Sequence, residues 1–237
     1  MTFDLLREST NFAQAVQDML DAVLPVDPRA DIEHRRLNVI KQDPWYVIRP
    51  GTQRKLGAIH LLSGGDHVAN LSLTFKCGPD RASRYLAVRK SSFQLQWLGE
   101  GPPLMRLDFD HKAHTVPVAH WNVHAERGAT SVLLARCNPK HVGLLSKVHL
   151  PVGGTRYRPC LEDFLEMIIK EFRFDTNPKW SDAIRAGRAS WRVKQAKSIV
   201  RDLPDIAVQI LENEIGYTIT PPTSGHPARN AEVLHDH

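Results

Sequence analysis

The chain has 237 residues, of which 42% are hydrophobic and 24% charged, and 31 Lys and Arg against 26 Asp and Glu give a formal net charge of +5. This composition is typical of a globular protein with a sizeable core, and it excludes collagen-like, disulfide-scaffold and globally disordered chains. No apolar run approaches the roughly 18 residues of a membrane helix, and the first residues do not resemble a secretory signal. Three cysteines without a C-x-x-C pair favour reduced thiols and a cytoplasmic location: Cys77, Cys137 and Cys160.

The N-terminal stretch has the period of an amphipathic helix. Thr10 is its expected N-cap, and Pro25 and Pro28 are expected to end it. Its apolar face consists of residues three and four positions apart: Phe12, Val16, Met19, Leu20 and Val23. Up to residue 50 we expect a connector in which the 45–48 run is buried and the basic residues are exposed, namely Arg35, Arg36 and Lys41.

From about residue 67 to residue 126 the hydrophobic period changes to two. Such alternation predicts an antiparallel sheet of about four strands, with one face packed and the other polar. We place this sheet within residues 51–158. The strands are marked by alternating apolar residues: Leu71, Leu73 and Phe75; Phe93, Leu95 and Trp97; Leu107 and Phe109; Trp121 and Val123.

The helical period returns over residues 159–217. Pro159 suits the first position of a helix whose apolar stripe is formed by Leu161, Phe164, Leu165, Ile168 and Phe172. Further helices are expected over 181–203 and 204–215, with Gly216 as the stop. Residues 218–237, rich in proline, are predicted to form a disordered tail. The expected fold is therefore α+β: a central antiparallel sheet covered by an N-terminal helix and a C-terminal helical segment.

Histidine is concentrated in one part of the predicted sheet. The chain has 12 histidines, and four of them lie between residues 111 and 124. Successive side chains of a strand point to opposite faces, so one face carries His120, Asn122, His124 and Glu126. If the preceding strand forms a hairpin with this one, Asp108 lies across from His120 and Arg106 lies across from Asn122.

This face predicts either of two chemistries. The first is a divalent metal site in which His120 and His124, on the same face of the strand, are joined by Asp108. Without a metal, His120 and His124 would act as general acid and base, assisted by Asp108 and Glu126, while Arg106 stabilises a phosphoryl transition state. The same pattern is equally that of an ordinary half-buried sheet with a polar outer face.

A resemblance covers residues 104–173. The runs RLDFDHKAH, HWNVHAERG and HLPVGGTRYRPCLEDFLEMII resemble those of a bacterial family of uncharacterised proteins. The aspartate-containing strand followed by a histidine-x-x-x-histidine strand is also similar to small TumE-type toxin–antitoxin components. The resemblance implies that His120 and His124 matter for function, and that the target is an RNA or the partner protein of a two-gene pair.

A basic segment follows in the C-terminal helices. Between Lys179 and Arg201 there are seven basic residues and one acidic residue, a net charge of +6. Nucleic-acid contacts are therefore expected from Arg185, Arg188, Arg192, Lys194 and Lys197. In one continuous helix the first three fall on one side and the last two nearly opposite, so a break near residues 187–190 is needed to merge them. Trp191 either stacks on a base or packs in the core.

Two functions stay open on the sequence. The first is a nucleic-acid-directed hydrolase, such as a ribonuclease-like toxin–antitoxin component, that uses the histidine face. The second is a non-enzymatic regulatory module that binds nucleic acid or protein through its basic helices. A membrane partner is expected in neither case. The remaining histidines are isolated along the chain and are expected to be ordinary surface or core residues: His34, His60, His67 and His141.

Overall fold

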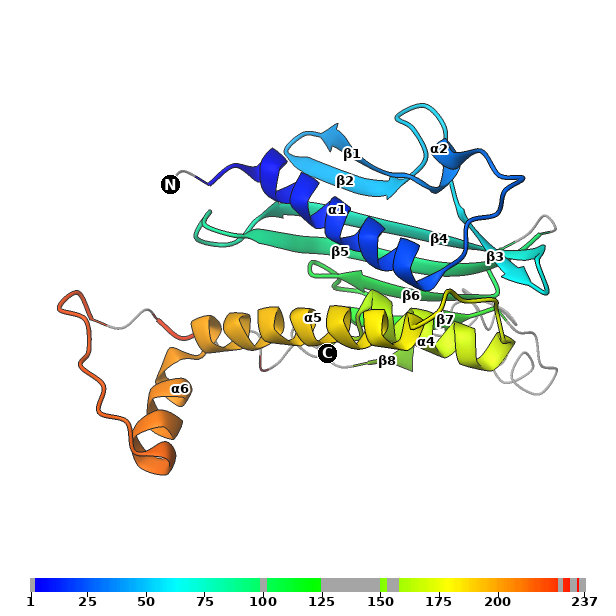
Figure 1. Ribbon diagram of the computed structural model, residues 1–237. Coiled ribbons are helices and arrows are strands. Elements are labelled where there is room, and N and C mark those ends of the chain that lie inside the picture. The colour runs from blue at the N-terminus through cyan, green and yellow to red at the C-terminus, as the bar shows by residue number, and fades with distance from the viewer. Residues whose placement is uncertain are drawn as a thin grey trace, which may run out of the picture.

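The computed structural model describes residues 3–98, 102–124, 150–152, 158–225, 228–230 and 234. In this part of the chain one antiparallel sheet carries helices on one of its faces (Figure 1). The α+β prediction, with a sheet covered by an N-terminal helix and C-terminal helices, is therefore confirmed. None of the helices in the described residues is long and apolar enough to cross a membrane.

The sheet is larger than the expected four strands. Its strands in the described residues are β1 Leu37–Gln42, β2 Trp45–Pro50, β3 Ile59–Ser63, β4 Asp66–Pro79, β5 Leu86–Trp97, β6 Met105–Asp110, β7 Ala119–Val123 and β8 Leu150–Pro151. They follow the order β1-β2-β4-β5-β6-β7-β8, with β3 paired to β4 beside this path. The sheet thus begins inside residues 1–50, where we expected only a helix and a connector. Strands β1 and β2 are short and only partly buried, so they lack the long alternation that marked the others.

The two faces of the sheet differ as the alternation predicts. Leu73 pairs with Phe93 and Phe93 with Leu107, and all three are buried in the core beneath the helices. Their neighbours Ser92 and Asp108 also pair, on the opposite and polar face. The period of two therefore identified the core face of the long strands correctly.

Helix α1 (Leu5–Val23) crosses the sheet with its apolar face inward (Figure 1). The expected stripe is confirmed, but the N-cap is Asp4, whose Oδ1 accepts a hydrogen bond from the Arg7 backbone N–H at 3.1 Å. Thr10 lies inside the helix, and its hydroxyl donates to the Leu6 carbonyl at 2.9 Å. The helix begins earlier than predicted because Leu5 and Leu6 continue it for one more turn behind an acidic cap.

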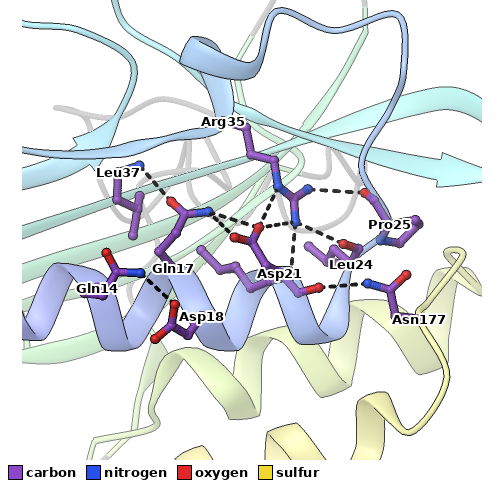
Figure 2. A network of polar contacts seen from close by, with 10 residues as sticks. Gln14, Gln17, Asp18, Asp21, Leu24, Pro25, Arg35, Leu37 and Asn177 are labelled. Atoms are coloured by element: carbon purple, nitrogen blue, oxygen red, sulfur yellow. Dashed lines mark hydrogen bonds and ion pairs between the residues drawn. The ribbon is translucent and has the colours of Figure 1, made fainter.

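Arg35, which we expected to be exposed, is 5% exposed and binds the C-terminal end of α1 (Figure 2). It ends the short helix α2 (Ile32–Arg35). Its Nη2 donates to the carbonyls of Leu20 at 3.2 Å and Leu24 at 2.9 Å. Its Nη1 donates to the Pro25 carbonyl at 3.2 Å, and its Nε to Asp21 at 3.0 Å. Since α1 has no basic residue in its last turn, Arg35 supplies the cation that this end of the helix dipole favours.

The same end of α1 also holds two other parts of the chain. Gln17 accepts a hydrogen bond from the Leu37 backbone N–H at 2.9 Å, which ties α1 to β1. Asn177, in the loop between α4 and α5, donates to the Asp21 carbonyl at 2.8 Å and through its backbone N–H to Val23 at 3.0 Å. Figure 2 shows Arg35, Leu37 and Asn177 converging on this single helix end.

Helix α4 (Leu161–Phe172) covers the β5–β7 part of the sheet. Phe164 is fully buried and stacks on Trp121 of β7, with ring centroids 5.6 Å apart. Cys160, and not Pro159, precedes the first helical residue, and its backbone N–H donates to Asp163 at 3.1 Å. The predicted apolar stripe is confirmed except at Phe172, which is exposed.

The C-terminal helices are α5 (Trp180–Asp202), α6 (Pro204–Ile210) and the π-helical turn η2 (Leu211–Ile215), which ends at Gly216 with φ 88° as predicted. Helix α5 packs on α1 and α4, whereas α6 turns away from its end (Figure 1). Of the predicted tail, residues 218–225 and 228–230 form no helix or strand. Arg229 makes an ion pair with Asp205, and the Asn230 backbone N–H donates to Asp202 at 2.7 Å.

Candidate functional site

The β6–β7 hairpin has the predicted register. Asp108 is the partner of His120, and Arg106 is the partner of Asn122. All four side chains belong to the polar face of the sheet, since their neighbours Leu107 and Trp121 pair on the helix-covered face. The two cross-strand pairs predicted from the sequence are therefore confirmed.

Asp108 is the centre of this cluster. Its Oδ2 lies 2.5 Å from the Arg106 Nε, accepts a hydrogen bond from the Asn122 amide at 3.4 Å, and is 3.9 Å from the His120 Nε2. The Nδ1 of His120 is 2.7 Å from the Pro117 carbonyl, which can only accept, so this nitrogen carries the hydrogen and Nε2 faces Asp108. The cluster thus has an oriented imidazole beside a carboxylate that an arginine neutralises.

Burial limits what this cluster can do. His120 is 5% exposed and Asn122 is fully buried, although we expected both on an accessible face. Asp108 and Arg106 are only partly accessible. A polymeric substrate cannot reach His120 without displacement of the chain around it.

The tentative metal set His120, His124 and Asp108 is not brought together. Residues four positions apart on a strand are about 13 Å from each other, so His124, which directly follows β7, lies too far from His120 to share one ion. Within the described residues these three side chains form no ligand group. Arg106 also places a positive charge on Asp108, which opposes a second cation there. Glu126, the other expected carboxylate, lies outside the described residues.

The basic residues lie on one uninterrupted helix, α5, without the break near 187–190 that we expected a merged surface to need. Arg188 faces inward and is 17% exposed: it makes ion pairs with Asp163 at 2.7 Å and with Glu166, both on α4. Hydrogen bonds from Lys170 and Arg188 hold the pKa of Glu166 below its ordinary value. Arg188 is therefore a link between two helices and is not available to a ligand.

The other basic residues of α5 surround an exposed apolar stripe. This stripe, which we call the α5 crest, repeats every three or four positions: Ala186, Ala189, Val193, Ala196 and Val200. Arg185 and Arg192 each precede a crest residue by one position. Lys194, Lys197 and Arg201 each follow one. Because neighbouring helical residues are about 100° apart, the two groups flank the crest on opposite sides, and all five are exposed.

Trp191 belongs to the core side of α5. It is half-buried, and the guanidinium of Arg158 lies 4.8 Å from its ring. The same guanidinium lies 3.6 Å from the ring of Phe109. Of the two roles left open for Trp191, packing is the one that its contact with Arg158 supports.

A second polar cluster was missed on the sequence. Asp27, His60 and His67 each offer a ligand atom, and these atoms lie within 4.8 Å of one another. His60 Nδ1 is 2.9 Å from Asp27 Oδ2, and the His60 and His67 rings are stacked with centroids 3.6 Å apart. Within the described residues no other group of three such side chains comes this close together.

A β-bulge explains why alternation could not predict this cluster. In a regular strand His67 would share a face with Ala69 and Leu71, which are buried in the core. The pairing of β3 with β4 shifts between Leu61 and Leu62, so that Leu62 faces His67 instead of Val68. This extra residue turns His67 to the side of His60. The Gly64–Gly65 turn was the one local sign of a hairpin between the two histidines.

The described cysteines are unsuited to nucleophilic chemistry. Cys77 and Cys160 are free and buried. Burial raises the pKa of Cys77 to about 12 and also raises that of Cys160. Both thiols stay protonated at neutral pH, which agrees with a structural role for Cys160. Cys137 lies outside the described residues.

The comparisons with known proteins add no assignment to these clusters. No protein-family model, no curated protein and no solved structure matches the chain. A function for this chain is therefore inferred from the chemistry of its residues.

Proposed function

We propose that the protein binds nucleic acid through the solvent-facing side of α5. The observation that carries the proposal is the presence of basic residues on both sides of the α5 crest. Arg185 and Arg192 lie on one side, and Lys194, Lys197 and Arg201 lie on the other. All five cations are exposed, whereas the one arginine of the original set that faces inward, Arg188, is neutralised by α4. The chemical group that α5 recognises is the phosphodiester backbone, which DNA and RNA share.

The shape of α5 fits a groove. A helix of 23 residues is about 34 Å long, and the major groove of B-DNA is about 12 Å wide, enough to admit one helix. A narrow crest of alanine and valine allows close approach, while cations on both flanks reach the phosphates of the two groove walls. The absence of long polar side chains from the crest favours backbone contact over the reading of base edges.

The expected result is strongly salt-dependent binding. For the full chain with a 20-base-pair duplex, we expect the apparent affinity to fall steeply between 50 and 200 mM salt, with a slope of about −0.9 per phosphate contact. The variant R192Q/K194Q/K197Q loses three of the five contacts, so its slope should be shallower by about 2 to 3. Fluorescence anisotropy of the labelled duplex, repeated with single-stranded RNA, measures both quantities and distinguishes the two nucleic acids.

A charge-matched control separates this surface from net charge. The variant R54Q/K55Q/R81Q removes three other exposed cations, in the β2–β3 and β4–β5 connections, and leaves α5 intact. We expect its salt slope to equal that of the parent. Equal losses in the two triple variants, or a parent that does not bind either nucleic acid, would contradict the proposal.

The β6–β7 cluster supports a second function, which requires the chain around the buried His120 to move aside. This function is acid–base cleavage of a phosphodiester, with His120 as the proton-transfer group and Arg106 as the source of positive charge. The favouring observation is the 3.9 Å approach of His120 Nε2 to Asp108. If this function holds, the parent cleaves labelled RNA or DNA, with or without Mg²⁺, and H120Q and D108N lose the activity while H114Q retains it. A parent without cleavage, or an H120Q variant as active as the parent, counts against it.

A further inference from the structure

We propose that His60 and His67 form a binding site for a divalent transition-metal ion of the Zn²⁺, Ni²⁺ or Co²⁺ type, oriented by Asp27. The site lies on the β3–β4 hairpin, apart from the nucleic-acid surface proposed for α5, and does not depend on that function. The juxtaposition of one buried carboxylate with two stacked imidazoles carries the proposal.

The hydrogen bonds determine which nitrogen of each ring can bind a metal. Asp27 Oδ2 accepts from His60 Nδ1 at 2.9 Å, so the lone pair of the neutral His60 ring is on Nε2. His67 Nε2 is 2.9 Å from the Asn70 Oδ1; with this oxygen as acceptor, the lone pair of His67 is on Nδ1. Each ring therefore offers one ligand nitrogen, and the other nitrogen is used to orient it.

Asp27 has the position of an outer carboxylate. Its side chain is 3% exposed, and Oδ1 accepts from the backbone N–H and the Nε of Arg29, each at 3.0 Å. The hydrogen bond with His60, followed by those from Arg29, holds the pKa of Asp27 well below its ordinary range, so this buried carboxyl is ionised. A carboxylate that accepts from the far nitrogen of a histidine fixes the ring and increases its basicity toward a metal.

The surrounding loops hold this arrangement in place. Arg29 also donates from Nη2 to the Gly65 carbonyl at 2.8 Å, which links the Asp27 loop to the turn between β3 and β4. The backbone N–H groups of Gly64 and Gly65 donate to Asp175 at 3.1 and 2.7 Å. The two histidines are thus carried by a hairpin whose turn is anchored from two sides, which lowers the entropy cost of assembling a site.

One local movement is required. Nitrogen ligands at about 2.0–2.1 Å from a tetrahedral ion are about 3.4 Å apart and direct their lone pairs within the ring planes. The rings of His60 and His67 are nearly parallel, with an interplanar angle of 6°. In this stacked arrangement their nitrogen lone pairs cannot both point at one ion. Rotation of His67 about its Cβ–Cγ bond breaks its contact with Asn70 and its stacking on His60. His60 cannot turn without leaving Asp27, so it is the fixed ligand.

The ion is reached from the exposed edges of the rings. The cavity that His60 lines together with Asp27, Asp31 and Arg35 has a volume of about 10 Å³. That space holds about one water molecule and excludes a hydrated cation. Solvent water and Asp66, which begins β4 next to His67, can complete the coordination: Asp66 is 83% exposed, and its Oδ1 lies 3.6 Å from Arg29 Nη1.

The test uses the full chain after treatment with a chelator, titrated with Zn²⁺ by calorimetry and with Co²⁺ by visible absorption. We expect one equivalent of tightly bound metal in the parent and its loss in H60A and in H67Q. D27N should keep the Co²⁺ band but bind about tenfold or more weakly, because it alters only the orientation of His60. This difference separates a positioning residue from a ligand.

Controls deal with the other histidines and with folding. H111Q and the tail variant H235Q/H237Q should bind as the parent does. The circular dichroism spectrum of H67Q, a substitution on the surface of a hairpin, establishes that its fold is retained even if H60A unfolds. One-to-one binding that persists in H67Q, or a parent that binds no equivalent of either metal, overturns the proposal.

Discussion

Replacing Arg35 by methionine is expected to lower the free energy of unfolding by about 1 to 3 kcal/mol, because the carbonyls that this buried side chain binds lose their donor. Methionine keeps much of the side-chain volume but donates no hydrogen bond. The Leu24 and Pro25 carbonyls then lose the donor shown in Figure 2, and the Asp21 carboxylate loses its cation. Urea unfolding followed by circular dichroism measures the change.

Two further variants test whether the loss of stability comes from the contacts of Arg35. R36M alters the neighbouring exposed arginine and should change stability by less than about 0.5 kcal/mol. R35K restores the charge but not the planar fork that serves four acceptors, so it should recover only part of the loss. If R35M and R36M unfold at the same urea concentration, Arg35 does not hold the end of α1 as described.

Replacing Phe164 by alanine is expected to cost about 3 to 5 kcal/mol, the range found for truncating a buried phenylalanine. Phe164 is fully buried between the sheet and α4, stacked on Trp121 and 6.0 Å from the ring of Phe93. The truncation leaves a cavity at the centre of the interface, since its neighbours on the sheet are held by strand pairing. Urea unfolding monitored by tryptophan fluorescence measures the loss.

The matched comparison is F172A, at the other end of the same helix. Phe172 is 42% exposed and stacks on Phe174, so its truncation should cost about 1 kcal/mol or less. Similar losses for F164A and F172A would mean that α4 does not cover the sheet through Phe164.

The features predicted correctly from the sequence are those with a short, regular period. The stripe through Phe164 and Ile168 predicted the buried face of α4. The assumption of a hairpin between the two alternating runs, 107–109 and 121–123, gave the pairing of Asp108 with His120 that is found. In both cases neighbouring residues carry the information, because burial on one face repeats along the element itself.

The features that were missed depend on distant parts of the chain. Arg35 is buried because it donates to carbonyls at the end of α1, 11 and 15 positions earlier, and its own neighbours give no sign of this. His67 joins His60 because of a bulge, which inserts one residue into an otherwise regular pairing. The sequence did separate the basic residues of α5 into two groups, but it did not predict which half of the helix faces solvent, because that is decided by the packing of α5 on α1 and α4.

Hydrogen–deuterium exchange of the full chain, with and without a saturating 20-base-pair duplex at low salt, tests the central claim most directly. We predict added protection in peptides that cover α5, Trp180–Asp202, and unchanged exchange in β6 and β7. Protection confined to the β6–β7 hairpin, or no protection in α5 under conditions where the duplex binds, would contradict the assignment of nucleic-acid binding to this helix.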